Sequence, residues 1–318
     1  MDLVFCGTPQ FAVPVLSQLL RAGDFSVRLV VCQPDRPAGR GQSLAVPAVK
    51  QLALSHGLPV TQPEKIKNNL EFRAQLEEIH PAAIVVVAYG RMIPGWMLAL
   101  PLLGNINLHA SLLPKYRGAA PIQWAIASGE TITGVTTIRL DAGLDTGPIL
   151  GASEVAIDSE DTAATLAPRL AEAGSALTIE TLRGLAAGTI SPLEQDDHAA
   201  TLAPLLRKED GLIDFARPAA EIWNRLRGFT PWPGAYTSFR KKTLSLLLVR
   251  LAPAISEPLA PGQLHVQGHR LYVACGQNTT LEILELQLEG RKRTSAEGFL
   301  NGYQPQPGEL LIGPCGAS

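Results

Sequence analysis

The stretch Ala82-Ala83-Ile84-Val85-Val86-Val87-Ala88 decides the fold class of this sequence. It is apolar throughout, rich in β-branched residues and bounded by Pro81 and Gly90, which is typical of a strand buried on both faces. Two earlier apolar runs, at residues 3–6 and 27–32, have the same character. Because helical patterns separate these runs, the sequence predicts an α/β domain with a doubly wound, mainly parallel sheet.

Helices and further strands extend this pattern through the first 188 residues. Helices are expected where apolar residues recur three or four positions apart, at 11–22, 48–56, 70–79, 119–127 and 162–187. Strands are expected at 58–60, at 105–109 and as an edge pair within 134–157. Gly188 is well placed to end the last helix.

The remainder of the chain has a different pattern. Residues 189–206 lose periodicity and contain two prolines, so we expect a connection between two domains there. After a short helix at 219–227, strands are expected at 236–240, 244–251, 263–266, 271–275 and 280–286. A small β-barrel of the oligonucleotide-binding (OB) type is an economical way to bury them. The predicted domains are therefore 1–188 and 207–318, joined by a linker at 189–206.

Composition narrows the functional classes. With 46% hydrophobic and 18% charged residues, the chain has an ordinary globular composition. No apolar run approaches the ~20 residues that span a bilayer, and the first residues lack the features of a secretory signal, so we expect a cytoplasmic protein. Its four cysteines never form Cys-x-x-Cys, which argues against a structural zinc site or a disulfide framework.

The charge is divided unevenly along the chain. Residues 1–205 contain 14 Lys and Arg against 19 Asp and Glu, whereas residues 206–318 contain 13 against 10. The second part is thus mildly basic, which is compatible with a polyanionic partner but is also small enough to arise by chance.

The turn after the first strand is a candidate for a phosphate site. Its sequence, Gly7-Thr8-Pro9-Gln10-Phe11, does not supply Gly-x-Gly-x-x-Gly, and no acidic residue ends the second strand. An NAD-dependent dehydrogenase is therefore only a distant alternative.

Polar residues suited to catalysis begin at Asn107. Asn107 and His109 are two positions apart, so on a strand their side chains lie on one face, at the edge where open α/β sheets bind ligands. An amide can donate to an oxyanion and an imidazole can move a proton, which suits acyl transfer to an amine. The two residues alone are equally compatible with a strand-end histidine satisfied by backbone groups.

Two downstream blocks resolve this choice. They are Ser111-Leu112-Leu113-Pro114-Lys115-Tyr116-Arg117-Gly118-Ala119-Ala120-Pro121-Ile122 and Asp141-Ala142-Gly143-Leu144-Asp145-Thr146-Gly147-Pro148-Ile149-Leu150. The combined pattern Asn-x-His-x-Ser-Leu-Leu-Pro, Arg-Gly-x-x-Pro and Leu-Asp-x-Gly resembles the folate-dependent formyltransferase family. The resemblance implies a Rossmann-like N-terminal domain, 10-formyltetrahydrofolate as the formyl donor, no metal, and Asn107, His109 and Asp145 as catalytic residues.

The resemblance also implies roles. Asp145 is expected to orient and charge-stabilise His109, while His109 and Asn107 stabilise the oxygen of the tetrahedral intermediate. The acceptor amine attacks directly, so Ser111 is not a nucleophile. The segments similar to the family's folate-lining segments contain Ala88, Tyr89, Gly90, Arg91, Ile93, Ser111, Leu112, Leu113, Pro114 and Asp141.

The acceptor must be chosen from other features, because sugar-nucleotide members share the catalytic trio. The segment 33–42 resembles the loop by which tRNA-acting members engage the acceptor stem, with Arg36 and Arg40 as candidate contacts. It departs from the family's pattern because Gln42 and Ser43 stand where further lysines are usual, which weakens its electrostatic contribution.

The C-terminal part contains three more similar segments, at 207–215, 227–235 and 286–302. In the last of them Arg291, Lys292 and Arg293 are candidate contacts to tRNA phosphates. The expected function is formylation of the methionine amino group on initiator methionyl-tRNA for translation initiation, by an enzyme for which nothing requires more than a monomer. A sugar-nucleotide formyltransferase of the UDP-4-amino-arabinose type is the leading alternative, and a non-enzymatic RNA-binding protein is a distant one.

Overall fold

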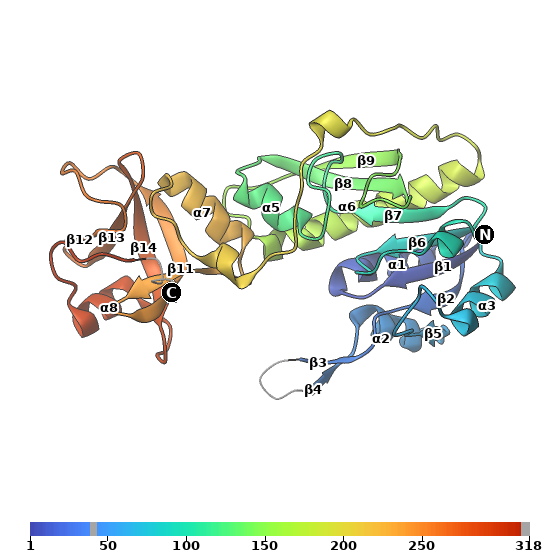
Figure 1. Ribbon diagram of the computed structural model, residues 1–318, viewed down its shortest axis with the longest axis horizontal. Helices are drawn as coiled ribbons and strands as arrows, with labels where there is room; N and C mark the ends of the chain where they lie inside the picture. Colours follow the sequence, from blue (N-terminus) through green and yellow to red (C-terminus); the bar gives the residue numbers. More distant parts are fainter. Residues whose placement is uncertain (39–42, 313–318) are drawn as a thin grey trace. The chain divides into compact units, whose positions relative to one another are not determined.

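The computed structural model describes residues 1–38 and 43–312 (Figure 1). Its chain divides into two compact units. The first contains Met1–Pro121, Ile132–Ile157 and Thr165–Pro204, and the second contains Ile122–Thr131, Asp158–Ala164 and the chain from Leu205 onward. The chain thus passes between the units more than once, whereas the sequence pattern suggested a single connection. Periodicity locates an element but does not say which core the element joins.

A seven-stranded sheet forms the centre of the first unit, in the order β5-β2-β1-β6-β7-β8-β9. Its five parallel strands are β1 (Asp2–Gly7), β2 (Ser26–Val31), β5 (Val60–Thr61), β6 (Ala83–Val87) and β7 (Asn105–His109). Two antiparallel strands, β8 (Ile132–Arg139) and β9 (Ile149–Ala156), complete one edge. The predicted doubly wound, mainly parallel sheet is confirmed.

Helices cover both faces of this sheet, because its parallel strands are apolar on both sides. On one face, α3 (Leu70–Ile79) and α4 (Gly95–Leu98) pack through Phe72, Leu76 and Met97 against β1, β2 and β6. On the other, α1 (Val13–Arg21) lies beside α6 (Ala163–Ala186), and Ser175 Oγ donates to Gln18 Oε1 at 2.7 Å. A one-turn 3₁₀ helix, Gln10–Ala12, leads into α1, and α2 is Ala48–Ser55.

A short hairpin occupies the Gly/Pro-rich stretch between β2 and α2. Its strands, β3 (Arg36–Ala38) and β4 (Ser43–Ala45), pair antiparallel (Figure 1). The predicted tRNA contact Arg40 lies outside the described residues, within 39–42.

The second unit is built on an antiparallel sheet in the order β10-β11-β14-β13-β12, with β15 paired to β14. Its strands are β10 (Ala235–Phe239), β11 (Lys242–Ala252), β12 (Leu264–Gln267), β13 (Arg270–Cys275), β14 (Thr279–Leu288) and β15 (Thr294–Ser295). Residues 309–312 hydrogen-bond to both edges, at Ser238 within β10 and at Gly262 and Leu264 where β12 begins. This segment closes the sheet, so the predicted small barrel is confirmed.

In the described part of the chain, the α-helices that belong wholly or mostly to the second unit are α5 (Pro121–Ala127), α7 (Ala219–Gly228) and α8 (Ala296–Tyr303). Phe299 of α8 packs into the barrel core against Phe239, with ring centroids 5.1 Å apart. The helix α8 has no clear signal in the sequence, because it has only eight residues and two of them, Gly298 and Gly302, have low helix propensity.

Residues 189–204, predicted as part of a linker, belong to the first unit. Two short 3₁₀ helices, Asp197–Ala199 and Lys208–Gly211, interrupt the chain on either side of Leu205. None of the helices in the described ranges is long and apolar enough to cross a bilayer.

Candidate active site

The carboxyl end of β7 presents the first two predicted catalytic residues. β7 lies between β6 and β8, so its backbone is held from both sides, with Asn107 opposite Val86 and Ile138. Asn107 and His109 share one face of the strand and are only 8% and 5% exposed. The sheet therefore fixes both side chains at the edge that the sequence predicted.

The ring of His109 is held from two directions. Its Nε2 lies 2.8 Å from the carbonyl oxygen of Tyr116, which can only accept, so Nε2 carries a proton. Its Nδ1 lies 3.6 Å from Oδ2 of Asp145, and an ion pair forms there when Nδ1 is also protonated. This distance is longer than a hydrogen bond, so the contact is electrostatic in the structure as it stands.

Asp145 reaches His109 from the loop after β8. Its backbone is left-handed, with φ 55°, and its Oδ2 also accepts from the N–H of Gly118 at 2.9 Å. Gly118 itself has φ 123°, and a Cβ there would lie 2.7 Å from the carbonyl oxygen of Ala203. Only glycine fits that position, which explains the Arg-Gly pair of the motif.

Asn107 differs from its neighbours in having an uncommitted side chain. Its amide makes no hydrogen bond to any part of the chain that the structure describes. A donor held on a buried strand and left unpaired is suited to an oxygen supplied by a substrate.

The segment after β6 carries five of the predicted folate contacts. Ala88 and Gly90 have positive φ, 46° and 76°, so the chain turns sharply at the strand end. Gln33 donates to the carbonyl oxygens of Tyr89 and Gly90 at 3.0 and 3.4 Å. Arg91 donates to Gln33 Oε1 and to the carbonyl oxygen of Glu64. The arginine side chain is therefore tied down locally.

The side chain of Tyr89 is buried in the core beneath this segment. Its ring lies in the core, and burial raises the pKa of its hydroxyl above the ordinary value. Any contact of this residue with folate comes through its backbone. Within the described chain the N–H groups of Gly90 and Met92 have no backbone partner, and Ile93 and Leu112 are partly buried apolar residues. Backbone donors beside an apolar wall fit a flat heteroaromatic group such as a pterin.

The segment Ser111 to Pro114 forms a rigid corner beside β8. Ser111 is fully buried, and its hydroxyl donates to the carbonyl oxygen of Lys115 at 2.6 Å. Thr136 Oγ1 donates to the Ser111 carbonyl and accepts from the N–H of Leu113. The serine hydroxyl is thus unavailable as a nucleophile, in agreement with direct attack by the acceptor.

Asp141 shapes the loop that carries Asp145. Its Oδ1 accepts from the N–H of Gly143 at 2.9 Å and from Thr146 Oγ1 at 2.8 Å. In this conformation the carboxylate is occupied by its own loop, which is a use that the sequence pattern did not suggest.

An open groove of about 630 Å³ lies at the carboxyl ends of β1 and β2. It is lined by Thr8, Pro9, Gln10, Gln33, Pro34, Arg36, Ala45, Val46, Pro47 and Ala48. Arg36, a predicted tRNA contact, is exposed at its wall, whereas the other lining residues were not predicted as site residues. The strand-end turn 7–11 lacks a dinucleotide-binding motif, but its position at the carboxyl edge of the sheet is a signal for a ligand groove.

The remaining predicted tRNA contacts lie in the second unit. Arg291, Lys292 and Arg293 are exposed on the turn between β14 and β15, and Arg293 pairs with Glu285. The sequence correctly predicted a basic turn there, while the contact with nucleic acid stays a prediction.

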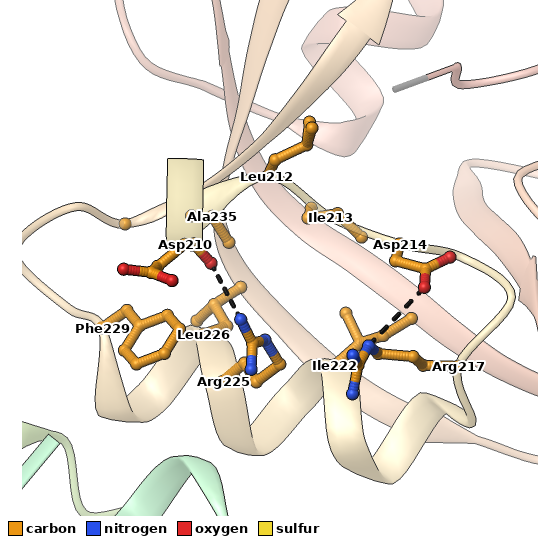
Figure 2. A pocket seen from close by; sticks show the side chains of 12 residues that line it. Asp210, Leu212, Ile213, Asp214, Arg217, Ile222, Arg225, Leu226, Phe229 and Ala235 are labelled. Carbon is orange, nitrogen blue, oxygen red and sulfur yellow. Dashed lines mark hydrogen bonds and ion pairs between the residues drawn. The ribbon is translucent and has the colours of Figure 1, made fainter. Parts of the chain in front are cut away.

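A much smaller pocket lies where the segment 210–214 meets α7, and Figure 2 shows its side chains. Arg225 Nη2 donates to the carbonyl oxygen of Asp210, and Arg217 faces Asp214 (Figure 2). The cavity measures about 10 Å³, which is room for about one water molecule. The segments 207–215 and 227–235, which resemble the family in sequence, therefore pack tightly around α7 and leave no room there for a substrate.

No group of three or more His, Cys, Asp or Glu side chains in the described chain is arranged to hold a metal ion. Cys6, Cys32 and Cys275 are buried and unpaired, and burial raises the pKa of each thiol, to about 12 for Cys32 and Cys275.

Two family descriptions match the chain. The one described as "Formyl transferase" matches residues 1–182, and the one described as "Formyl transferase, C-terminal domain" matches residues 205–304. A protein named "Methionyl-tRNA formyltransferase" from Koribacter versatilis is 61% identical over 311 residues, covering 98% of both chains. A protein of the same name from Geobacter metallireducens is 48% identical and also covers 98% of both chains.

A solved structure supports the fold at lower identity. It is the crystal structure of an N-formyltransferase from Helicobacter canadensis in complex with folinic acid and dTDP-3-aminofucose. The two chains superpose with a TM-score of 0.65 at 18% identity, covering 88% of this chain and 98% of the other. At that identity the likeness concerns architecture alone.

Proposed function

The chain belongs to the formyl transferase family, and we propose that it transfers the formyl group of 10-formyltetrahydrofolate to the amino group of methionine on initiator methionyl-tRNA. The observation that carries the choice of acceptor is the 61% identity, over 98% of both chains, to a relative named methionyl-tRNA formyltransferase. The sugar-acting structural neighbour is similar at only 18% identity.

The reaction requires one bond to form and one to break. The methionine nitrogen bonds to the formyl carbon, the carbon–N10 bond of the folate breaks, the amine loses a proton and N10 gains one. The carbonyl oxygen bears negative charge in between, so donors fixed around it stabilise the transition state more than the substrate.

Three residues divide this work. Asn107 supplies an amide N–H that is free of other partners in the described chain. His109, held at Nε2 by Tyr116, presents Nδ1 beside Asp145, so protonation of Nδ1 creates a cation next to the reacting carbonyl. Asp145 stabilises that cation and orients the ring. The folate is held by backbone groups at 88–93 and by the corner at 111–114.

Several exposed basic side chains of the described residues, together with Arg40, are our candidates for contacts with the tRNA backbone. Arg36 and Arg40 lie on the segment 33–42, and Arg291, Lys292 and Arg293 lie on the β14–β15 turn. Phosphate contacts position a nucleic acid without reading its sequence. We place the enzyme in the cytoplasm, where it acts as a monomer.

The first test is formyl transfer from 10-formyltetrahydrofolate to charged initiator tRNA, with UDP-4-amino-arabinose as a competing acceptor. We expect transfer to the tRNA, and a loss of about 10²- to 10⁴-fold in kcat for Asp145→Ala. Asp24→Ala, which removes only an exposed ion pair with Arg183, serves as the matched control and keeps its rate. Transfer to the sugar nucleotide alone would overturn the choice of acceptor, and transfer to neither would overturn the reaction.

A further inference from the structure

The segment 193–203 connects the two loops that carry the candidate site. At one end, Leu193 and Ile149 exchange backbone hydrogen bonds of 2.7 and 2.8 Å just after the Asp145 loop. At the other, the Arg117 N–H donates to Thr201 and the Ala203 N–H donates to the Arg117 carbonyl, at 2.8 and 2.7 Å. The stretch that composition marks as a linker is therefore a strap across the site, and we call residues 193–203 the strap.

Among the described residues, Gln195 is the strap residue whose side chain hydrogen-bonds to the Asp145 loop. Its Nε2 donates to the carbonyl oxygens of Asp145 and Gly147 at 2.8 and 2.7 Å. Its Oε1 accepts from Nε and Nη2 of Arg117 at 3.0 and 2.9 Å. The orientation of the amide is unambiguous, because a guanidinium only donates and a carbonyl only accepts.

We call the hydrogen bonds of Gln195 to Asp145, Gly147 and Arg117 the clamp, and Arg117 restrains it. Arg117 is only 7% exposed, and its Nη2 also donates to Asp197 Oδ1 at 2.8 Å. Asp197 is itself highly exposed, so its pairing with Arg117 adds little. Gln195 therefore joins a buried cation on the 117–118 loop to the backbone of the Asp145 loop.

The Asp145 loop needs such support. Asp145 has φ 55°, a conformation that side-chain-bearing residues disfavour. Two residues on, Gly147 packs so closely that a Cβ would lie 1.8 Å from the carbonyl oxygen of Arg139. The two bonds from Gln195 fix the backbone on either side of Thr146, and that backbone sets the 3.6 Å approach of Asp145 to His109.

We propose that Gln195 is a positioning residue for formyl transfer, which acts by holding Asp145 in place through the Asp145 and Gly147 carbonyls. The proposal rests on the proposed function for its kinetic readout. A displacement of about 1 Å in a catalytic group can cost about 100-fold in rate, so we expect Gln195→Met to lower kcat about 10- to 100-fold. The KM values for tRNA and folate stay within about twofold, because Gln195 touches neither site directly.

Two further variants separate positioning from general damage. Gln195→Glu keeps an acceptor for Arg117 but removes the donor to the two carbonyls, so its kcat falls at least as far as that of Gln195→Met. Gln18→Met is the matched control: it replaces another partly buried glutamine, whose Oε1 accepts from Ser175, and we expect it to keep the wild-type kcat.

A double-mutant cycle gives the decisive measurement. If Gln195 acts through Asp145, then adding Gln195→Met to Asp145→Ala changes kcat by less than about twofold, since the group it positions is gone. An independent multiplicative loss in the double variant overturns the proposal, as does a wild-type kcat in Gln195→Glu.

Hydrogen exchange makes the test independent of the acceptor. We expect the amides of residues 143–147 to exchange faster in Gln195→Met than in the wild type, with no change in Gln18→Met. Unchanged exchange there overturns the clamp even if the enzyme formylates methionyl-tRNA. If residues 143–147 exchange faster in Gln195→Met but the wild-type enzyme does not formylate tRNA, the proposed function is overturned and the role of Gln195 in holding the Asp145 loop stands.

Discussion

Asn105 and Asn107 show at the scale of single residues how a strand assigns different tasks to like side chains. They lie two positions apart on one face of β7. The Asn105 amide donates to the carbonyl oxygens of Met97 and Leu98 at 2.9 and 3.2 Å, which holds α4 against the sheet. The Asn107 amide has no such partner in the described chain. Asn105 therefore stabilises the fold, whereas the side chain of Asn107 is available to hydrogen-bond to a substrate.

Asn107→Ala tests the second role. Removing one donor from an oxyanion site lowers kcat by about 10²- to 10³-fold. We expect that loss in steady-state formylation assays, with the free energy of unfolding in urea changed by less than about 1 kcal/mol. The reason is that no internal hydrogen bond is broken.

Asn105→Ala is the matched control and behaves in the opposite way. Loss of its two buried hydrogen bonds costs about 1–3 kcal/mol of stability, while kcat stays within about threefold. The assignment is wrong if Asn107→Ala keeps its rate, or if the two variants are indistinguishable in both measurements.

At the scale of secondary-structure elements, the barrel carries a buried acid across three strands. Glu282 of β14 lies opposite Arg250 of β11 and Tyr272 of β13. Its carboxylate accepts from Arg270 at 2.8 and 2.7 Å and from Arg250 at 2.6 Å, and Arg270 lies over the Tyr272 ring. Charges of opposite sign on neighbouring strands stabilise the sheet.

This arrangement predicts a specific acid sensitivity. Hydrogen bonding from Arg270, with Arg250 in support, lowers the pKa of Glu282 to about 2. An unfolded glutamate titrates near ~4.3, so the ionised form stabilises the fold at neutral pH, and this contribution is lost as pH falls from about 5 through 2. Glu282→Gln should lower the free energy of unfolding at pH 7 by up to about 3 kcal/mol and flatten its acid dependence.

Urea unfolding at a series of pH values measures the effect of Glu282. The exposed Glu257, replaced by Gln, is the control and leaves the profile unchanged. An acid dependence in Glu282→Gln equal to that of the wild type contradicts the prediction.

The closure of the barrel depends on a segment too short to be assigned as a strand. Residues 309–312 hydrogen-bond to both edges of the sheet, and Leu311 points into the core while Leu310 is largely outside it. Because side chains alternate along an extended segment, Leu311 packs into the barrel core while Leu310 faces outward, and the burial of Leu311 holds this segment against the barrel.

We expect Leu311→Ala to lower the free energy of unfolding by about 2–4 kcal/mol, the usual cost of truncating a buried leucine. Leu310→Ala, on the adjacent exposed residue, costs less than about 1 kcal/mol. Thermal or urea unfolding compares the two, and equal losses would show that burial of Leu311 does not seal the barrel.

At the scale of the whole molecule, charge is distributed unevenly between the parts of the chain. Residues 1–205 contain more acidic than basic residues, whereas residues 206–318 contain 13 basic against 10 acidic ones. Since tRNA is a polyanion, its affinity depends on local clusters of exposed cations and falls as salt rises.

Replacing Arg291, Lys292 and Arg293 with Ser should weaken tRNA binding. The slope of log K for tRNA binding against log salt concentration should become shallower by about 1 for each phosphate contact that is lost. The loss is nearer two contacts than three, because Arg293 already pairs with Glu285. KM for 10-formyltetrahydrofolate stays unchanged. Lys241→Ser with Lys242→Ser, at the end of the β10–β11 turn and the first residue of β11, is the basic control and keeps the wild-type salt dependence. Equal salt dependence in the wild type and the triple variant rejects the contact.

The sequence by itself determined most of the helices and strands, and the family. The periods of apolar residues located α3 and β7 at the residues where the structure has them. The motif around Asn107, His109 and Asp145 identified the three side chains that the fold then brought to one edge of the sheet. These features are local: a strand or a motif is encoded by residues that are adjacent in the chain.

Only the tertiary structure decided which distant segments support one another. Gln195 bonds to Asp145 and to Arg117, residues 50 and 78 positions away, so no local pattern marks it. The same is true of residues 309–312, which close a barrel whose edges lie at Ser238 and Gly262. A hydrogen bond between remote segments leaves no periodic signal in either, because its geometry exists only after the sheets have formed.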